Sequence, residues 1–277
     1  MSQGALQDGE SAAGGRGSWS GLDTRHILVL AGTTEARELA EQLAPRRDIA
    51  LILSLAGRTR DPLPLPAPTR TGGFGGAEGL AAYLSQHAID VLIDATHPFA
   101  RQITQNAATA ARLAGVPLIR LERPAWTAEP GDRWQPVASV EAAVAALGTA
   151  PKRVFLAIGR QEAAAFEAAP QHRYLVRSVD PVEPPLQLPQ LETLLSRGPF
   201  DEAAEEQLLR ARQIEVIVCK NSGGAATYGK IAAARTLGLP VVMIERPAPV
   251  TALRAGTTAE AVALLDHGLG LPAKRGV

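Results

Sequence analysis

The chain has 277 residues, more than one domain usually needs, and 46% of them are hydrophobic, which is enough to bury two ordinary cores. Lysine plus arginine equals aspartate plus glutamate at 28 each, so no global field attracts nucleic acid or an anionic membrane, and we expect neither as a partner. The single cysteine excludes an intramolecular disulfide framework and a cysteine-rich metal site, so we expect no metal and a reducing, cytoplasmic compartment.

The N-terminal segment is rich in glycine, serine and alanine and contains no apolar run. We expect residues 1–24 to be a disordered leader that carries no secretion signal. Elsewhere, no uninterrupted apolar stretch approaches the roughly 20 residues that span a bilayer. The sequence therefore predicts a soluble protein.

The chain contains an internal repeat, which bears on the architecture before any single motif is considered. Three segments of the first half match three segments of the second half in the same order, which favours two similar lobes. A general likeness among parallel strands is the alternative. The matched pairs are Ile27–Ala36 with Val154–Ala163, Ile89–Thr96 with Ile214–Asn221, and Gly115–Pro124 with Gly238–Pro247.

Short apolar runs alternate with alanine-rich amphipathic segments, a pattern typical of βαβ units whose strands are covered on both faces. We therefore predict an α/β protein with one parallel sheet in each lobe. In the first lobe, strands are expected over 26–31, 49–54, 90–94 and 117–122, and helices over 35–44, 77–87 and 99–114. In the second lobe, strands are expected over 153–158, 173–177, 214–219 and 240–245, and helices over 160–168, 201–212, 227–237 and 258–266.

Open parallel sheets bind ligands beyond the carboxyl ends of their strands, where helix N-termini supply free N–H groups. Gly32, Thr33, Thr34 and Glu35 follow the first strand at such a point. The glycine permits close backbone approach, and either threonine could cap the helix or bind a phosphate oxygen. These residues fit a pyrophosphate cradle and, equally well, a capped turn without a ligand.

The second strand ends at Ser54 and is followed by Ala56, Gly57 and Arg58. Near this point an NAD-binding fold carries the acid that holds the ribose 2′-hydroxyl. Here Arg58 and Arg60 replace that acid, and guanidinium groups suit a 2′-phosphate, so we expect NADPH rather than NADH. Solvated loop arginines are the alternative.

Polar residues also follow the strands over 90–94 and 214–219, which the repeat matches to each other. Thr96, His97, Pro98 and Phe99 follow the first of these strands, and we expect His97 to face the cleft as a proton donor, a substrate contact or a packed ring. The second strand leads into a cation, two hydrogen-bonding groups and a glycine pair, which fit an anionic or amide-bearing ligand or a solvated loop. These residues are Lys220, Asn221, Ser222, Gly223 and Gly224.

Basic residues recur at the predicted sheet edges and helix starts. Their convergence would form a pocket for a ligand with several carboxylates, whereas the Arg-Pro pairs could merely tie strand ends to loops. Two aromatic positions are also open: Phe74, next to Gly73 in a glycine-rich loop, fits an adenine contact or a turn, and Trp126 fits an apolar macrocycle or packing between lobes. The basic residues are Arg101, Arg120, Arg123, Arg160, Arg177, Lys230 and Arg246.

With these motifs in place, the sequence resembles the precorrin-6A reductase family of cobalamin biosynthesis, together with its cobalt-precorrin counterpart, over about residues 25 to 268. No single motif is decisive, and the resemblance lies in their order and spacing. The motifs are LAGTTEAR at 30–37, SLAGR at 54–58, DATHPFA at 94–100, LERPAW at 121–126, Gly159 to Glu162, and KNSGG at 220–224. The leader and the proline-rich stretch after Arg60 depart from the family's pattern.

The resemblance implies two Rossmann-like lobes with a ligand cleft between them: an NADPH-binding domain over 25–130 and a domain over 131–270 that completes the substrate cleft. It implies hydride transfer from NADPH to one double bond of a polycarboxylated tetrapyrrole, precorrin-6A, which becomes precorrin-6B. His97 or Lys220 would donate the accompanying proton or position the substrate, and neighbouring enzymes of the pathway are candidate partners. Gly32, Thr33, Thr34, Ser54 and Arg58 match dinucleotide positions, and His97, Lys220, Asn221, Ser222 and Gly223 match nicotinamide and macrocycle positions.

Two rival functions fit parts of the sequence. A methyltransferase that uses S-adenosylmethionine shares a Rossmann-like fold, but it would prefer a carboxylate where Arg58 stands. A noncatalytic two-lobed binding protein shares the cleft architecture, but the expected absence of a secretion signal weakens that interpretation.

Overall fold

The computed structural model describes residues 24–57 and 63–268. The predicted leader, apart from its last residue, lies outside the described residues, and so do Arg58 and Arg60. No helix within the described ranges is both long and apolar enough to cross a bilayer.

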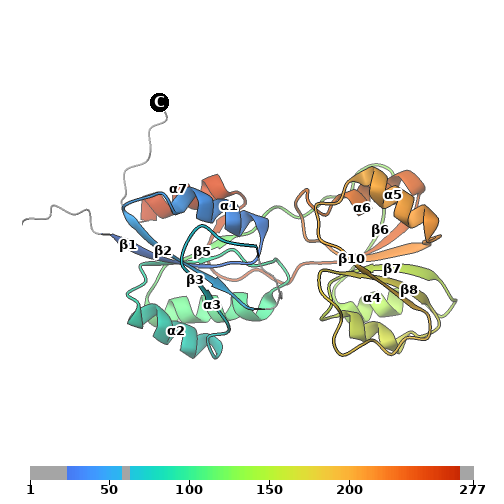
Figure 1. The fold of residues 1–277 in the computed structure, drawn as a ribbon, viewed down its shortest axis with the longest axis horizontal. Helices are drawn as coiled ribbons and strands as arrows, with labels where there is room; N and C mark the ends of the chain where they lie inside the picture. The colour runs from blue at the N-terminus through green and yellow to red at the C-terminus, as the bar shows by residue number, and fades with distance from the viewer. Residues whose placement is uncertain (1–23, 58–62, 269–277) are drawn as a thin grey trace, which may run out of the picture.

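Two lobes lie side by side, and each contains a six-stranded sheet covered by helices on both faces (Figure 1). Every strand pair in the first sheet is parallel, and the order is β3-β2-β1-β4-β5-β12. This is the order of a dinucleotide-binding sheet, with its switch point between β1 and β4. The strands are β1 Arg25–Leu30, β2 Ile49–Leu55, β3 Thr69–Thr71, β4 Val91–Asp94, β5 Leu118–Leu121 and β12 Leu253–Ala255.

The second sheet repeats this arrangement in the order β9-β8-β7-β10-β11-β6, again with parallel pairs throughout. Its switch point lies between β7 and β10. The two sheets confirm the predicted pair of parallel-sheet lobes. The strands are β6 Arg133–Val137, β7 Arg153–Ala157, β8 Arg173–Ser178, β9 Leu191–Leu195, β10 Val216–Lys220 and β11 Pro240–Ile244.

Helices α1 and α7 cover one face of the first sheet, and α2 and α3 cover the other (Figure 1). In the second lobe α5 and α6 lie on one face and α4 on the other. The predicted helix over 160–168 is shorter than expected, a 3-10 helix over Ala163–Ala168. The α-helices are α1 Thr34–Leu43, α2 Gly76–Gln86, α3 Arg101–Ala114, α4 Val140–Ala146, α5 Glu202–Ala211, α6 Gly229–Leu237 and α7 Thr258–Gly268.

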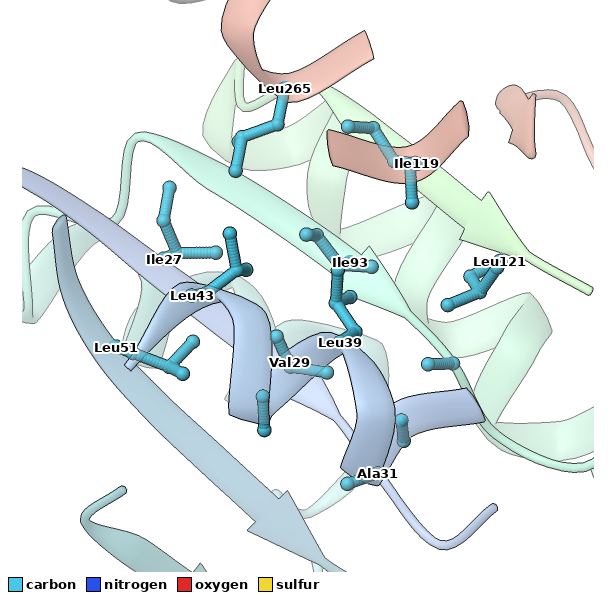
Figure 2. Packing of buried hydrophobic residues seen from close by; sticks show 14 of the residues in the cluster. Ile27, Val29, Ala31, Leu39, Leu43, Leu51, Ile93, Ile119, Leu121 and Leu265 are labelled. Atoms are coloured by element: carbon cyan, nitrogen blue, oxygen red, sulfur yellow. The ribbon is translucent and has the colours of Figure 1, made fainter. Parts of the chain in front are cut away.

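Strand β1 shows why continuous apolar runs form the centre of the sheet. Its residues alternate between faces: Ile27 and Val29 pack beneath α1 and α7 (Figure 2). Leu28 and Leu30 pack in the core beneath α2 and α3. All four are at most 2% exposed. A strand that is buried on both faces needs this unbroken apolar sequence.

The chain crosses between the lobes twice. After β5 it passes to β6, the edge strand of the second sheet, and after β11 it returns to β12, the edge strand of the first. Ala261 and Leu265 of α7 are fully buried in the first lobe's core. The prediction that residues 131–270 form the second lobe, including the helix over 258–266, is therefore wrong at its C-terminal end.

Most of the elements that the prediction missed are edge strands of the two sheets. Strands β3, β6, β9 and β12 and helix α4 were not expected. Strand β6 is mostly exposed and contains Pro136, which an edge strand tolerates and a central strand does not. Strand β12 has three residues, two of them exposed, so it carries no apolar run that could mark it.

Replacement of Leu265 tests the return of the chain to the first lobe. Leu265→Ala removes a fully buried side chain from the first lobe's core and should lower the free energy of unfolding by about 2–5 kcal/mol. Urea denaturation measures this change. The exposed Ala263 of the same helix provides the control, because Ala263→Ser should stay within about 0.5 kcal/mol of the parent chain. Equal effects of the two substitutions would contradict the packing of α7.

Candidate active site between the two sheets

The carboxyl ends of the strands at both switch points lead into loops that contact one another. Phe99, in the loop after β4, packs against the second lobe's core. The Lys220 ammonium at the end of β10 lies 5.2 Å from the centre of the Phe99 ring. Phe99 and Lys220, which were predicted at the edges of different sheets, therefore meet between the lobes.

The turn after β1 begins α1. Thr33 caps this helix, since its hydroxyl accepts a hydrogen bond from the Ala36 amide at 3.1 Å and donates one to the Ala95 carbonyl at 2.8 Å. The capping alternative for Thr33 is thus confirmed, and its hydroxyl joins the ends of β1 and β4. Gly32 has a φ of 132°, and both Gly32 and Thr34 are exposed. The amides of Thr34 and Glu35 have no partner within the helix, which leaves donors at this turn.

An arginine that the sequence analysis did not select organises the ends of β2 and β3. Arg70 donates hydrogen bonds to the Ser54 hydroxyl at 2.8 Å and to the carbonyls of Gly72 and Gly73 at 3.0 Å each. Its guanidinium lies 3.8 Å from the centre of the Phe74 ring. Only the pairing of β3 with β2 brings Arg70 to this edge, and the short β3 was not foreseen. Ala56 and Gly57 lie exposed beside it.

A buried ion pair supports the loop after β4. Asp94 and Arg120 are 0% and 3% exposed, and Arg120 Nη1 lies 2.9 Å from Asp94 Oδ1. The same carboxylate oxygen accepts hydrogen bonds from the amide and the hydroxyl of Thr96. Arg120 also contacts Glu122 at 3.3 Å. Thr96, a predicted cofactor contact, is thereby fixed in orientation.

His97 lies beside these charges and is partly buried. Burial lowers the pKa of His97 to about 3, assisted by the positive charges of Arg123, Lys220, Arg246 and Arg120. Its Nδ1 accepts a hydrogen bond from the Phe99 amide at 3.2 Å. A neutral imidazole that accepts at Nδ1 carries its proton on Nε2, so His97 presents a hydrogen-bond donor there. The adjacent Pro98 is buried.

Lys220 is 8% exposed, and its Nζ lies 2.5 Å from Glu162 Oε1. Glu162 begins the short helix after β7 and is 33% exposed at its side chain, so it connects the buried ammonium to solvent. Glu162 ends the Gly159–Glu162 motif, and the sequence alone indicated no role for its side chain. The pairing joins the two strand ends at the second lobe's switch point.

The loop after β10 is held by the first crossover. Asn221 accepts a hydrogen bond from the Trp126 amide at 2.8 Å and donates one to the Trp126 carbonyl at 3.0 Å. The Trp126 ring nitrogen donates to the Gly224 carbonyl at 2.9 Å. The oxygen and nitrogen of the Asn221 amide and the ring nitrogen of Trp126 thus all form hydrogen bonds within the protein. The Trp126 ring packs against the second lobe's core.

Two arginines, one from each crossover, hold the same loop. Arg123 Nε donates to the carbonyls of Ser222 and Gly223, and Arg246 donates to those of Asn221 and Ser222. The glycine is required here, because a Cβ on Gly223 would lie 2.0 Å from the Pro124 carbonyl oxygen. Both arginines therefore fit the second alternative predicted for them, in which the Arg-Pro segments tie strand ends to neighbouring loops.

Three predicted substrate residues take no part in the hydrogen bonds that hold these loops. Arg177 is buried in an ion pair with Glu205 of α5, at 2.5 Å. Lys230 is 4% exposed, donates to the Thr227 carbonyl and lies 4.8 Å from the centre of the Trp126 ring, and burial lowers its pKa. Arg101 is exposed at the start of α3 and has no ion-pair partner among the described residues. Of the three, only Arg101 has its charge exposed to a ligand.

Comparison with known proteins supplies the identity of the fold. The family described as precorrin-6x reductase CbiJ/CobK matches residues 26–266. The precorrin-6A reductase of Sinorhizobium sp is 58% identical over 250 residues, which cover 90% of this chain and 96% of the relative. That of Rhodobacter capsulatus is 51% identical over 244 residues, which cover 87% and 96%.

A solved structure, described as CobK precorrin-6A reductase, has a TM-score of 0.83 and 48% sequence identity, and the match covers 92% of this chain and 100% of that one. The likeness in sequence and in fold extends across both lobes and confirms the resemblance stated above. The chain belongs to the precorrin-6x reductase family.

Proposed function

We propose that this chain is a precorrin-6A reductase, which transfers a hydride from NADPH to one double bond of precorrin-6A and yields precorrin-6B. The observation that carries the proposal is the meeting of two switch points in a member of this family, with His97 and Lys220 between them. The reaction adds a hydride to one carbon and a proton to its neighbour. The protein must therefore orient two ligands and deliver one proton.

The first lobe fits the dinucleotide. No heavy atom lies within 4 Å of the position that a Cβ on Gly32 would occupy, so a pyrophosphate can approach the backbone there. The Thr34 and Glu35 amides and the dipole of α1 favour an anion, while Thr33 keeps the turn in place. When bound, NADPH supplies the hydride. The residues proposed to hold it are Gly32, Thr33, Thr34, Glu35, Ser54, Ala56, Gly57, Arg58, Gly73 and Thr96.

We assign the 2′-phosphate to the edge formed by β2 and β3. In the sequence, Arg58 is the third residue after β2, and Arg70 already brings a guanidinium to Ser54 at that edge. Two cations and no acidic residue in the run from Ser54 to Arg60 favour a phosphate over a free hydroxyl.

The substrate's carboxylates would meet donors on both lobes. Neutral His97 offers its Nε2–H, and Arg101 offers an exposed guanidinium at the start of α3. Arg123 and Arg246 add positive potential, although their hydrogen bonds mainly hold the loop Lys220–Gly224. Pro98 and Phe99 offer apolar surface beside these groups. We accordingly place the macrocycle between the His97 loop and the Lys220 loop.

The proton donor follows from the state of each group. A neutral imidazole is a poor acid, whereas the Lys220 ammonium carries a proton and lies 2.5 Å from Glu162, which is open to solvent. We therefore assign proton delivery to Lys220 or to a water molecule that it orients, and substrate positioning to His97.

The direct test combines binding and turnover. Purified protein is titrated with NADPH, NADH and S-adenosylmethionine, then given precorrin-6A while nicotinamide absorbance is followed. We expect NADPH to bind most tightly and to be consumed in equal amount with precorrin-6A. Binding of NADPH without consumption would favour the two-lobed binding protein, and preference for S-adenosylmethionine would favour a methyltransferase.

Arg58→Glu tests the cofactor preference. Replacement of a phosphate-binding cation by an anion should raise the Kd for NADPH at least about tenfold, or 1.4 kcal/mol, and should spare NADH. Fluorescence titration measures both constants. Arg47→Glu is the matched control, because it reverses an exposed charge just before β2, at the opposite end of that strand. Equal weakening of NADPH and NADH by Arg58→Glu would exclude the 2′-phosphate assignment.

The lowered pKa of His97 predicts how stability depends on pH. In the unfolded chain histidine takes up a proton near pH 6.5, whereas folded His97 does so only near pH 3. Protonation therefore favours unfolding between these values, and acidification from pH 7 to 5 should lower the free energy of unfolding by at most about 1.4 kcal/mol per pH unit at this site. His97→Gln should remove that slope.

Urea denaturation at pH 7, 6 and 5 measures the effect. His267→Gln, which replaces an exposed histidine at the end of α7, should keep the parent slope. If His97→Gln also kept it, His97 would not be held neutral in the folded protein.

A further inference from the structure

Arg123 contacts both the turn at which we place NADPH and the loop at which we place the macrocycle. Its Nη1 lies 2.7 Å from Glu35 Oε2 in the first turn of α1. Its Nε donates to the Ser222 carbonyl at 2.8 Å and to the Gly223 carbonyl at 3.0 Å. A single guanidinium thus joins the first helix of one lobe to the main chain of the other lobe's loop.

We infer that Glu35 and Arg123 are a positioning pair that couples cofactor binding to the orientation of the loop Lys220–Gly224. This inference rests on the proposed function. It replaces the expectation that the Glu35 carboxylate contacts the cofactor and the Arg123 guanidinium the substrate, because these two charged groups engage each other; the Glu35 amide keeps its proposed role at the pyrophosphate. The pair would act through the turn and the loop that it holds.

The contact is close enough to transmit a displacement. The side chains of Arg123 and Glu35 are 16% and 21% exposed, so the pair is shielded from much of the solvent screening that weakens surface pairs. A Cβ on Gly224 would lie 2.8 Å from Arg123 Cδ, and the loop therefore packs directly on the arginine stem. A shift of α1 would move Arg123 and, with it, the loop backbone.

The internal repeat offers a comparison within the same chain. Arg246 occupies the position in the second crossover that Arg123 occupies in the first. Arg246 contacts Glu122 and the main chain of Arg123, Asn221 and Ser222, all of them parts of the crossover or the loop. Of these two repeat-related arginines, only Arg123 has a contact with α1 among the described residues. The link to the turn at which we place NADPH is thus not shared by Arg246.

Glu35 also explains why a cation is needed at this point. Its carboxylate lies in the helix turn whose free amides we assign to the pyrophosphate, so an unneutralised Glu35 would repel that group. Arg123 offsets the negative charge. The pair therefore has two separable effects: charge neutralisation should govern NADPH affinity, and the physical link should govern hydride transfer.

Three variants separate these effects: Glu35→Gln, Arg123→Met and the double variant. Glu35→Gln removes the negative charge and leaves Arg123 uncompensated, so it should not raise the Kd for NADPH, and it should slow single-turnover hydride transfer about tenfold, a typical size for coupling between sites. Arg123→Met should raise the Kd about fivefold, because Glu35 is left unneutralised, and should slow transfer to a similar extent. The double variant should recover the parent Kd and remain slow.

Hydrogen exchange supplies a readout that does not depend on turnover. In the parent chain, NADPH alone should slow exchange in the loop Lys220–Gly224, and Glu35→Gln should abolish that protection. Glu38→Gln removes an exposed charge from the same helix and should preserve the protection, the Kd and the transfer rate. Thermal unfolding verifies that each variant is folded, and Arg123→Lys, which keeps the charge without the planar donors, should restore the Kd but not the rate.

The outcomes distinguish this inference from the proposed function. A parent chain that binds NADPH but never oxidises it with precorrin-6A would refute the function. A parent chain that turns over, with Glu35→Gln equally fast and equally protected by NADPH, would refute the coupling alone. A double variant that binds NADPH as weakly as Arg123→Met would refute the role of charge neutralisation.

Discussion

The arrangement of the two lobes depends on a chain of ion pairs along the crossovers. It runs from Asp94 through Arg120 and Glu122 to Arg246, with contacts of 2.9, 3.3 and 3.1 Å. Charges with so little exposure are stable only when each is paired, and removal of one leaves its partner buried and uncompensated. Because Arg246 also holds the main chain of Ser222, this network connects the end of β4 to the loop after β10.

The same network contributes to the state of His97. Burial of the imidazole is the main cause of its lowered pKa, and the positive charges of Arg123, Lys220, Arg246 and Arg120 oppose its protonation in the same direction. The site therefore presents a neutral hydrogen-bond donor at His97, and the Lys220 ammonium nearby is paired with Glu162. An environment of paired arginines, with one exposed guanidinium at Arg101, suits an anionic ligand better than it suits a cationic catalytic histidine.

Sequence reasoning identified the parts of the fold that are buried on both faces. Strand β1 and the capping role open to Thr33 were visible because an unbroken apolar run and a helix start have local signatures. Strand β12 could not be predicted, because it has only three residues, two of them exposed, and is recognised as a strand by its pairing with β5. Arg177 looked like a ligand-binding cation because nothing in the sequence indicates that Glu205 of α5 faces it. Likewise, the Asn221 side chain forms two hydrogen bonds with the main chain of Trp126. These bonds depend on the path of the first crossover, which the sequence repeat does not indicate.

The repeat also explains how two similar lobes can have different ligands. In the first lobe the turn after β1 leads directly into α1, whose N-terminus is capped and open to an anion. At the matching point of the second lobe, the turn after β7 leads into a short 3-10 helix, and Glu162 at its start binds Lys220. The second turn thus lacks a full helix dipole and has an acid committed to a strand-end cation, which makes it unsuited to a pyrophosphate. Divergence of these two turns, with the strand order kept in both sheets, is consistent with our proposal that the first lobe binds the dinucleotide and the second lobe completes the substrate site.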